Sequence, residues 1–211
     1  MSIVRDQFNR PGENVEVGFH LSHYASLGTA RGEVFIQVVD VESGDVLQDE
    51  HLENVITLDA GILAAILFMN KSSRSNDANM LAVGTGATGA ILSPDAPSAD
   101  QRKLNAEIAR KGWSSTTFRD ASGNAVAIPT NIVDFTCVYD EGEAVGPLNE
   151  MGILSTISDN PLILNPNPDT YPTRDVTRDL TLYDVLVNYL TFSVITKPST
   201  ARLTITWRIT F

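Results

Sequence analysis

Residues 203–211 alternate apolar and polar side chains without a break, and most of these side chains are β-branched or aromatic. A period of two places every apolar side chain on one face of a strand and every polar one on the other. A second run of this kind covers residues 190–196, and residues 197–200 between the two runs predict a β-hairpin connection. The sequence therefore predicts a sheet with one face in a hydrophobic core, and it places Trp207 in that core.

Other runs of apolar and β-branched residues predict strands at 33–40, 46–56, 80–83, 131–139 and 148–154. Two segments predict helices. Residues 58–69 are apolar on nearly every side, and in residues 104–112 Leu104 and Ile108 stand one turn apart before Gly112. The predicted fold class is mainly β, an antiparallel β-sandwich or jelly roll with one or two packed helices.

The chain is expected to form a single β-sandwich domain over residues 31–211. Residues 1–30 mix Gly, Asn, His and Ser with scattered apolar positions, which indicates an N-terminal arm or lead-in. A long Pro-rich loop is expected at residues 155–179, with prolines at Pro161, Pro166, Pro168 and Pro172. Loops of this length are usually functional or disordered.

Charge and composition exclude several classes of partner. The formal net charge is -11, and residues 120–173 contain no Lys or Arg. Affinity for phosphate backbones comes from these cations, so we expect neither nucleic acid nor an anionic membrane as a partner. The apolar stretch at residues 61–69 is far shorter than the ~20 residues of a membrane span, and residues 1–6 lack the apolar core of a secretory signal.

The single cysteine, Cys137, permits no intrachain disulfide. This fits a protein made in a reducing compartment. Cys137 shares one side of its predicted strand with Phe135 and Tyr139, and no basic residue or histidine lies close to it in sequence. We therefore predict a small buried core residue rather than a reactive thiol.

Residues 84–89 match the pattern G-x-G-x-x-G and follow a predicted strand. In a dinucleotide site these glycines let backbone amides approach a pyrophosphate at the start of a helix. Here residues 90–97, with Pro94 and Pro97, stand where that helix would have to begin. The pattern therefore predicts a loop, flexible or involved in assembly, and no cofactor is expected.

Metal-binding and catalytic patterns are weak. The histidines are scattered and do not form a zinc set, at His20, His23 and His51. An acidic segment between two strands predicts a hairpin turn, with calcium binding or glycoside cleavage as alternatives, and it contains Asp140, Glu141 and Glu143. We predict no metal site and no catalytic residue. Trp113 and Tyr171 are the candidate contacts with a glycan or another partner.

Five segments, read in order, resemble small jelly-roll-like virion structural proteins of tailed bacteriophages, those of tails, baseplates, collars and capsid decorations. They are residues 54–57, 81–86, 104–111, 148–153 and 203–211. The resemblance spans residues 33–211, with residues 155–179 as an insertion. It implies a non-enzymatic protein that forms ring-like or trimeric homo-oligomers, in which Glu107, Arg110 and Lys111 are structural.

Three functions are therefore expected in turn. The first is a structural virion component of the tail, baseplate or collar, in contact with copies of itself and with other virion proteins. The second is a capsid decoration protein, because the resemblance does not indicate a position in the particle. The third belongs to another class, a carbohydrate- or receptor-binding sandwich module that uses the 155–179 loop with Tyr171, and Trp113.

Overall fold

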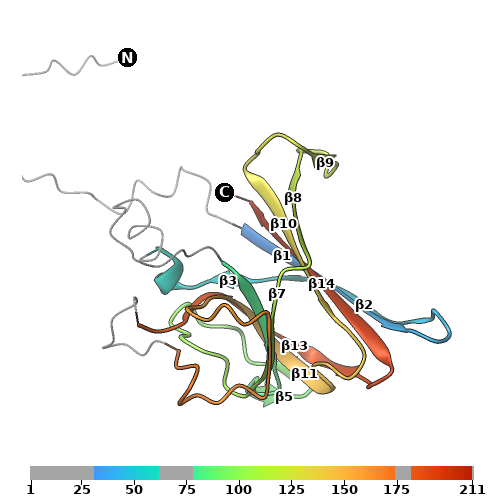
Figure 1. The fold of residues 1–211 in the computed structure, drawn as a ribbon, viewed down its shortest axis with the longest axis vertical. Helices are drawn as coiled ribbons and strands as arrows, with labels where there is room; N and C mark the ends of the chain where they lie inside the picture. The colour runs from blue at the N-terminus through green and yellow to red at the C-terminus, as the bar shows by residue number, and fades with distance from the viewer. Residues whose placement is uncertain (1–30, 62–77, 174–181, 211) are drawn as a thin grey trace, which may run out of the picture.

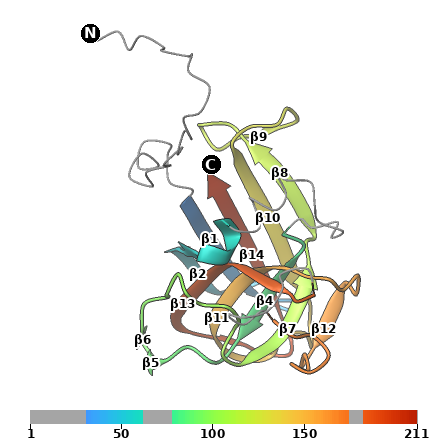
Figure 2. The same cartoon turned by 90° about the vertical axis from the view of Figure 1, so that its left-hand side faces the viewer.

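The computed structural model describes residues 31–61, 78–173 and 182–210. In these residues two six-stranded antiparallel sheets pack together as a β-sandwich (Figures 1 and 2). The predicted mainly β fold class is confirmed. The 1–30 arm, His20 and His23 lie outside the described residues, as do residues 174–179 of the Pro-rich loop.

The first sheet has the spatial order β2 (Val46–Glu53), β1 (Arg31–Asp40), β14 (Ala201–Thr210), β10 (Ile132–Tyr139), β8 (Ser115–Arg119) and β9 (Ala125–Val126). The second sheet has the order β12 (Leu162–Leu164), β7 (Glu107–Gly112), β4 (Met80–Gly84), β11 (Gly146–Ser155), β13 (Val185–Lys197) and β3 (Val55–Ile56). A small separate hairpin consists of β5 (Gly89–Ala90) and β6 (Ser93–Pro94).

The first sheet follows the simple alternation of its sequence. β14 lies between β1 and β10, and its apolar residues from Leu203 to Ile209 are buried while the intervening Thr and Arg side chains are more exposed. Trp207 is fully buried and lies opposite Val34 in β1 and Phe135 in β10. The core position predicted for Trp207 is confirmed.

The second sheet is buried on both faces. Every residue of β4 is buried, and most of β11 is too. In β11, Met151 and Ile153 belong to the core between the sheets, whereas Leu154 belongs to a smaller cluster on the outer face. That outer cluster contains Met80, Ala82, Leu104, Leu154, Leu186 and Tyr189.

The predicted helix at residues 104–112 is wrong, because residues 107–112 form β7, which pairs with β4 and β12. Leu104 packs in the outer cluster, while Ile108 packs against the core between the sheets. The two side chains therefore lie on opposite faces of the second sheet rather than on one face of a helix. Of the other predicted helix, residues 58–61 are helical, and residues 62–69 lie outside the described residues.

Two predicted hairpins are instead connections between sheets. β13 belongs to the second sheet and β14 to the first, so residues 197–200 carry the chain from one sheet to the other. Residues 140–145 do the same between β10 and β11. Alternation shows which side of a strand is buried, but it does not show which sheet the strand joins. In contrast, β1 and β2 do form a hairpin, and β3 then joins the second sheet.

No helix among the described residues is long and apolar enough to cross a membrane.

Candidate functional site

A buried carboxylate joins three segments on the outer face of the second sheet. Glu150 of β11 has no exposed surface, and its carboxylate accepts four hydrogen bonds. Oε1 accepts from the amides of Gly86 at 3.0 Å and Ala106 at 2.7 Å. Oε2 accepts from the amide of Asn105 at 3.0 Å and from the Tyr189 hydroxyl at 2.7 Å. We call these five residues the Glu150 junction.

The junction explains two glycines of the G-x-G-x-x-G pattern. A Cβ atom on Gly86 would lie 2.4 Å from the Ala106 nitrogen, and one on Gly84 would lie 2.5 Å from the Ala106 oxygen. The neighbouring Ala87 amide donates to Asn149 Oδ1 at 3.0 Å. Amides that would approach a phosphate in a nucleotide site are here bonded to side chains of the chain's own β11.

A second buried cluster surrounds Arg110 on the same outer face. Its Nε and Nη2 atoms bond Glu107 at 2.5 and 2.7 Å, and its Nη1 bonds Asp184. The other oxygen of Asp184 accepts from the Ile157 amide at 2.9 Å. Burial raises the pKa of Glu107, although the Arg110 guanidinium acts in the opposite direction. The side chains of Glu107, Arg110 and Asp184 are therefore bonded to one another, and the role that the resemblance implies for Glu107 and Arg110 stays a prediction.

The acidic segment at residues 140–143 forms ion pairs with the side chains of Lys111 and Arg202. Lys111 Nζ lies 2.6 Å from Glu143 Oε2 and 3.2 Å from Asp140 Oδ2, and Arg202 Nε lies 3.3 Å from Asp140 Oδ1. The hydrogen bond from Lys111 is the main cause that lowers the pKa of Asp140. A general acid for glycoside cleavage needs a raised pKa, whereas the pKa of Asp140 is lowered.

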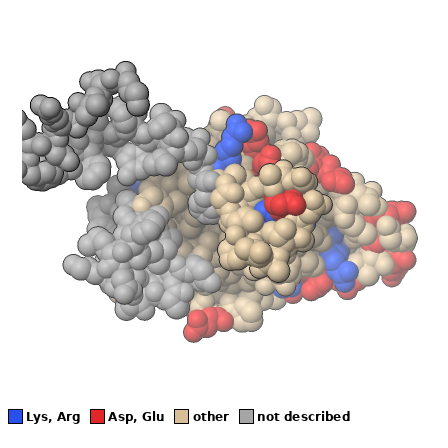
Figure 3. All heavy atoms as spheres, turned by 90° about the horizontal axis from the view of Figure 1, so that it is seen from above, with Lys and Arg blue, Asp and Glu red and all other residues tan. Residues whose placement is uncertain are grey.

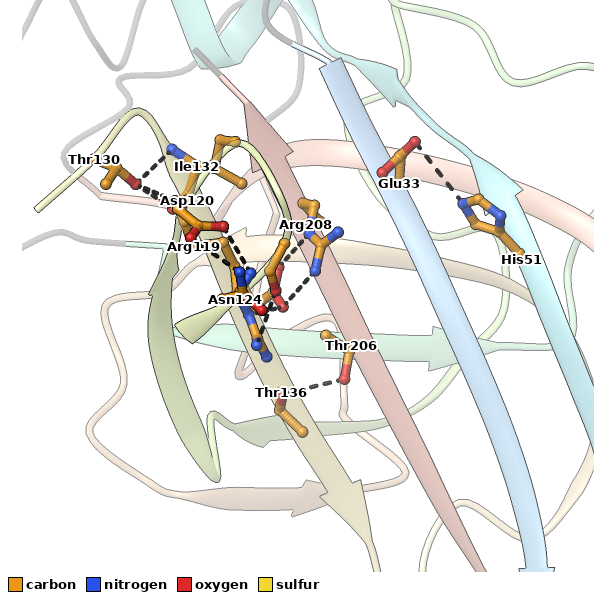
Figure 4. A network of polar contacts seen from close by, with 12 residues as sticks. Glu33, His51, Arg119, Asp120, Asn124, Thr130, Ile132, Thr136, Thr206 and Arg208 are labelled. Carbon is orange, nitrogen blue, oxygen red and sulfur yellow. Dashed lines mark hydrogen bonds and ion pairs between the residues drawn. The ribbon is translucent and has the colours of Figure 1, made fainter. Parts of the chain in front are cut away.

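The first sheet carries a polar network on its exposed face (Figure 4). Asp134 bonds Arg119 Nε at 2.7 Å and Arg208 Nε and Nη2 at 2.7 and 2.9 Å. Burial opposes ionisation of Asp134, but the hydrogen bonds and charges of the two arginines outweigh it and lower the pKa. Nearby, His51 stacks on Phe35 with ring centroids 4.4 Å apart.

Trp113 and Tyr171, the candidate partner contacts, lie on different faces of the second sheet. Trp113 is half-buried against the core between the sheets, where its indole NH donates to the Ala78 carbonyl and its ring contacts Phe135. Tyr171 is half-buried on the outer face, with the Arg110 guanidinium 5.7 Å from its ring centroid. The structure does not bring the two aromatic rings into one site.

Tyr171 lines a cavity of about 210 Å³ between β7 and the Pro-rich loop. Pro166 and Pro168 form apolar parts of its wall, and Lys103 and Thr173 contribute polar groups. This volume is below the roughly 300–1,000 Å³ of sites for drug-sized ligands. The cavity can accept only a small group.

Cys137 is fully buried, as predicted, and burial raises its pKa to about 12. Such a thiol is a poor nucleophile because little thiolate forms near neutral pH. Among the described residues, no group of three or more His, Cys, Asp or Glu side chains could hold a metal ion.

Sequence reasoning did not single out Glu150 as a site residue. Its neighbours in β11 indicate a buried strand, and a Glu in such a strand normally points to water. The sequence does contain one signal that this face of β11 is covered. Gly152 stands two positions after Glu150 and therefore lies on the same face of the strand. Gly152 leaves room for Leu104 and Leu186, whose side chains a Cβ atom there would meet at 3.3 and 2.5 Å. That crowding shows that the face is covered.

Comparison of the sequence with models of known protein families gives no match. Comparison with curated proteins gives no match either. A functional proposal for this chain must therefore rest on its residues, its fold and its contacts.

Proposed function

We propose that the chain is a non-enzymatic structural component of a tailed-phage virion, in the tail, baseplate or collar, where it assembles with copies of itself and with other virion proteins. The observation that carries the proposal is the Glu150 junction. Three of the segments on which the resemblance depends, residues 81–86, 104–111 and 148–153, meet there. These three segments lie far apart in sequence, but hydrogen bonds to one carboxylate hold them together.

Rigidity supports this proposal. A part that transmits force or holds a ring together needs loops that do not move independently of the sheets. The junction fixes residues 84–87 and 105–106 to β11 through a buried, fully hydrogen-bonded carboxylate, and such networks are stiff because an unpaired member would be costly. Among the described residues, β2 and β12 are edge strands of the two sheets, and such edges offer places where other chains can add.

Charge also supports the proposal. The net charge of -11 repels the phosphate backbone of a packaged genome. Figure 3 shows acidic side chains spread more widely than basic ones over the face in view. A virion part with this surface does not bind the genome non-specifically.

The test is the mass of the purified chain in solution, measured by mass photometry and sedimentation velocity over a range of concentrations. A closed oligomer of defined size is expected. A protein that stays strictly monomeric at 22.9 kDa with its fold intact would contradict the proposal. The position of its density in particle images would separate the tail, baseplate or collar from the alternative, capsid decoration.

A carbohydrate- or receptor-binding module is the second candidate, and the cavity at Tyr171 is the observation that favours it. Aromatic rings beside polar groups are a common way to bind a sugar ring. A glycan array probed with the wild type, with Tyr171→Ala and with Tyr183→Ala as a matched half-buried control tests this function. Loss of a signal in the Tyr171 variant alone would support it, and no signal with any of the three proteins would exclude it.

A further inference from the structure

β2 forms one edge of the first sheet. Its 8 residues pair with β1 on one side, and no strand among the described residues pairs with it on the other. A strand that pairs on one side only leaves every second backbone N–H and C=O group available to another strand. The other edge strands, β3, β9 and β12, have only 2 or 3 residues each. β2 is therefore the long edge of the described sandwich.

Both faces of β2 are open to solvent. Six of its 8 residues are exposed, and the other two, Gln48 and Leu52, are half-buried. Leu52 packs against the core between the sheets. Figure 1 shows β2 and the turn that joins it to β1 at the right-hand margin of the molecule. A further strand can approach this edge without displacing any described element.

The edge is acidic. Residues 32–70 contain no Lys or Arg, and β2 carries three carboxylates, those of Asp49, Glu50 and Glu53. The rest of the hairpin adds four more, at Glu33, Asp40, Glu42 and Asp45. Among the described residues, no Lys or Arg forms an ion pair with a carboxylate of β2. These charges are therefore available to a partner.

The carboxylates of β2 lie on both faces of the sheet. Asp49 stands opposite Gln37 of β1, and Glu50 stands opposite Ile36. Successive side chains of a strand point to opposite faces, so these two adjacent carboxylates point in opposite directions. A strand placed beside β2 would meet negative charge on each of its own faces.

A second copy of β2 does not fit this edge. An antiparallel pair in one continuous sheet places residues of the same face opposite each other. In the two registers of this kind that overlap most of the strand, either Asp49 or Glu50 would lie opposite its own copy. Like charges directly opposite are destabilising. The carboxylates therefore disfavour self-pairing and favour a strand of the opposite charge.

We propose that β2 is the docking site for an extended, Lys- or Arg-rich segment of another protein, which adds to the first sheet as a further strand. Main-chain hydrogen bonds hold such a segment, and side chains at alternate positions select it. Here the selecting groups are the carboxylates of Asp49, Glu50 and Glu53. The inference rests on the proposed function, because it names the chemistry of the other virion protein that the chain contacts.

The probe is a fluorescent synthetic peptide of Lys, Thr and Val with the length of β2, 8 residues. Fluorescence anisotropy measures its affinity for the wild type, for Asp49→Lys and for Glu50→Lys. Asp159→Lys is the matched control, since Asp159 is also exposed but lies between β11 and β12. Each edge variant should bind roughly tenfold more weakly, and the control should differ by less than about twofold. Equal affinities for all four proteins would overturn the proposal.

Two altered peptides distinguish strand addition from charge attraction alone. The first keeps every Lys but has proline on both of its edges, so it lacks N–H donors for a sheet. The second keeps its N–H donors but has Thr in place of Lys. Both should bind at least about tenfold more weakly than the Lys peptide. If either binds the wild type as tightly as the Lys peptide does, the proposal is wrong.

Hydrogen exchange shows where the Lys peptide lies. Alternate amides of β2 already bond β1, and the amides between them point away from it. Those outward amides in residues 46–53 should exchange more slowly when the peptide is bound. Unchanged exchange along β2 with the peptide bound would place the peptide elsewhere and would contradict strand addition.

Sedimentation velocity separates this inference from the proposed function. If the wild type is an oligomer but does not bind the Lys peptide, the inference fails and the proposed function stands. If it binds the peptide through β2 but stays a monomer of 22.9 kDa at every concentration, the docking site stands and the proposed function fails. If Glu50→Lys changes the mass of a wild-type oligomer, a second copy occupies the edge, and the inference is overturned.

Discussion

The two sheets of the sandwich have the same number of strands but differ in what covers their outer faces. The outer face of the first sheet presents Thr and Arg side chains of β14 to solvent. The outer face of the second sheet is covered by loops, which bury a second apolar cluster and the side chain of Glu150. The second sheet therefore lies between two apolar clusters. Substitution of a buried polar residue on its outer face should lower the free energy of unfolding as much as substitution of a core residue.

The largest effect is expected at the junction. Glu150→Ala removes the acceptor of four hydrogen bonds, one buried and three part-buried. An unsatisfied buried donor costs about 1–3 kcal/mol, so the free energy of unfolding should fall by about 4 kcal/mol. Urea unfolding measures this loss. Thr204→Ala, on the outer face of the first sheet, is the control and should cost under about 1 kcal/mol. Similar losses for the two variants would break the contrast between the sheets.

The first sheet has its own critical residue on its inner face. Trp207→Ala should lower the free energy of unfolding by about 3–5 kcal/mol, because it leaves a large cavity between the sheets. Differential scanning calorimetry can follow the accompanying fall in Tm. A variant with undiminished thermal stability would show that the register of β14 is different.

These two residues show what the sequence can predict. Trp207 could be placed because the outer face of its strand meets water, and the alternation is therefore visible in the residue types. Glu150 could not be placed, because its burial depends on loops 44 to 64 residues away in sequence. No pattern within β11 shows which amides its carboxylate will meet.

Burial of both faces of the second sheet also explains why the helix predicted at residues 104–112 is wrong. Where both faces of a strand are buried, apolar residues do not alternate, and the spacing of Leu104 and Ile108 then resembles a helix. The connections between sheets were missed for a related reason. The residue types of β13 and β14 show a buried side in each strand, but not the partner strands.

A smaller effect is expected from crowding at the glycine loop. Gly86→Ala would bring a Cβ atom to 2.4 Å from the Ala106 nitrogen, so the backbone must move, at a cost of about 1–3 kcal/mol. Gly112→Ala is the matched control, since its nearest contact would be 3.8 Å. Chemical denaturation of both variants measures the difference, and equal stabilities would show that the loop does not pack closely on residue 106.

The smallest effect concerns pH and the exposed face of the first sheet. Arg208 and Arg119 lower the pKa of Asp134 in the folded state despite its burial, so the stabilisation is present above the unfolded-state pKa of about 3.9. It is lost as the pH falls through the lower folded-state value. Asp134→Asn should cost about 1–2 kcal/mol at pH 7 and progressively less below pH ~4. A cost that does not change with pH would show that the charge of Asp134 is not what matters.

Hydrogen exchange at three amides tests most directly whether the buried carboxylate holds the outer face of the second sheet together. The amides of Gly86, Asn105 and Ala106 should be protected in the wild type. In Glu150→Gln they should exchange much faster, while the amide of Trp207 in the other sheet keeps its relative protection. Equal protection of the three amides in both proteins would contradict the account.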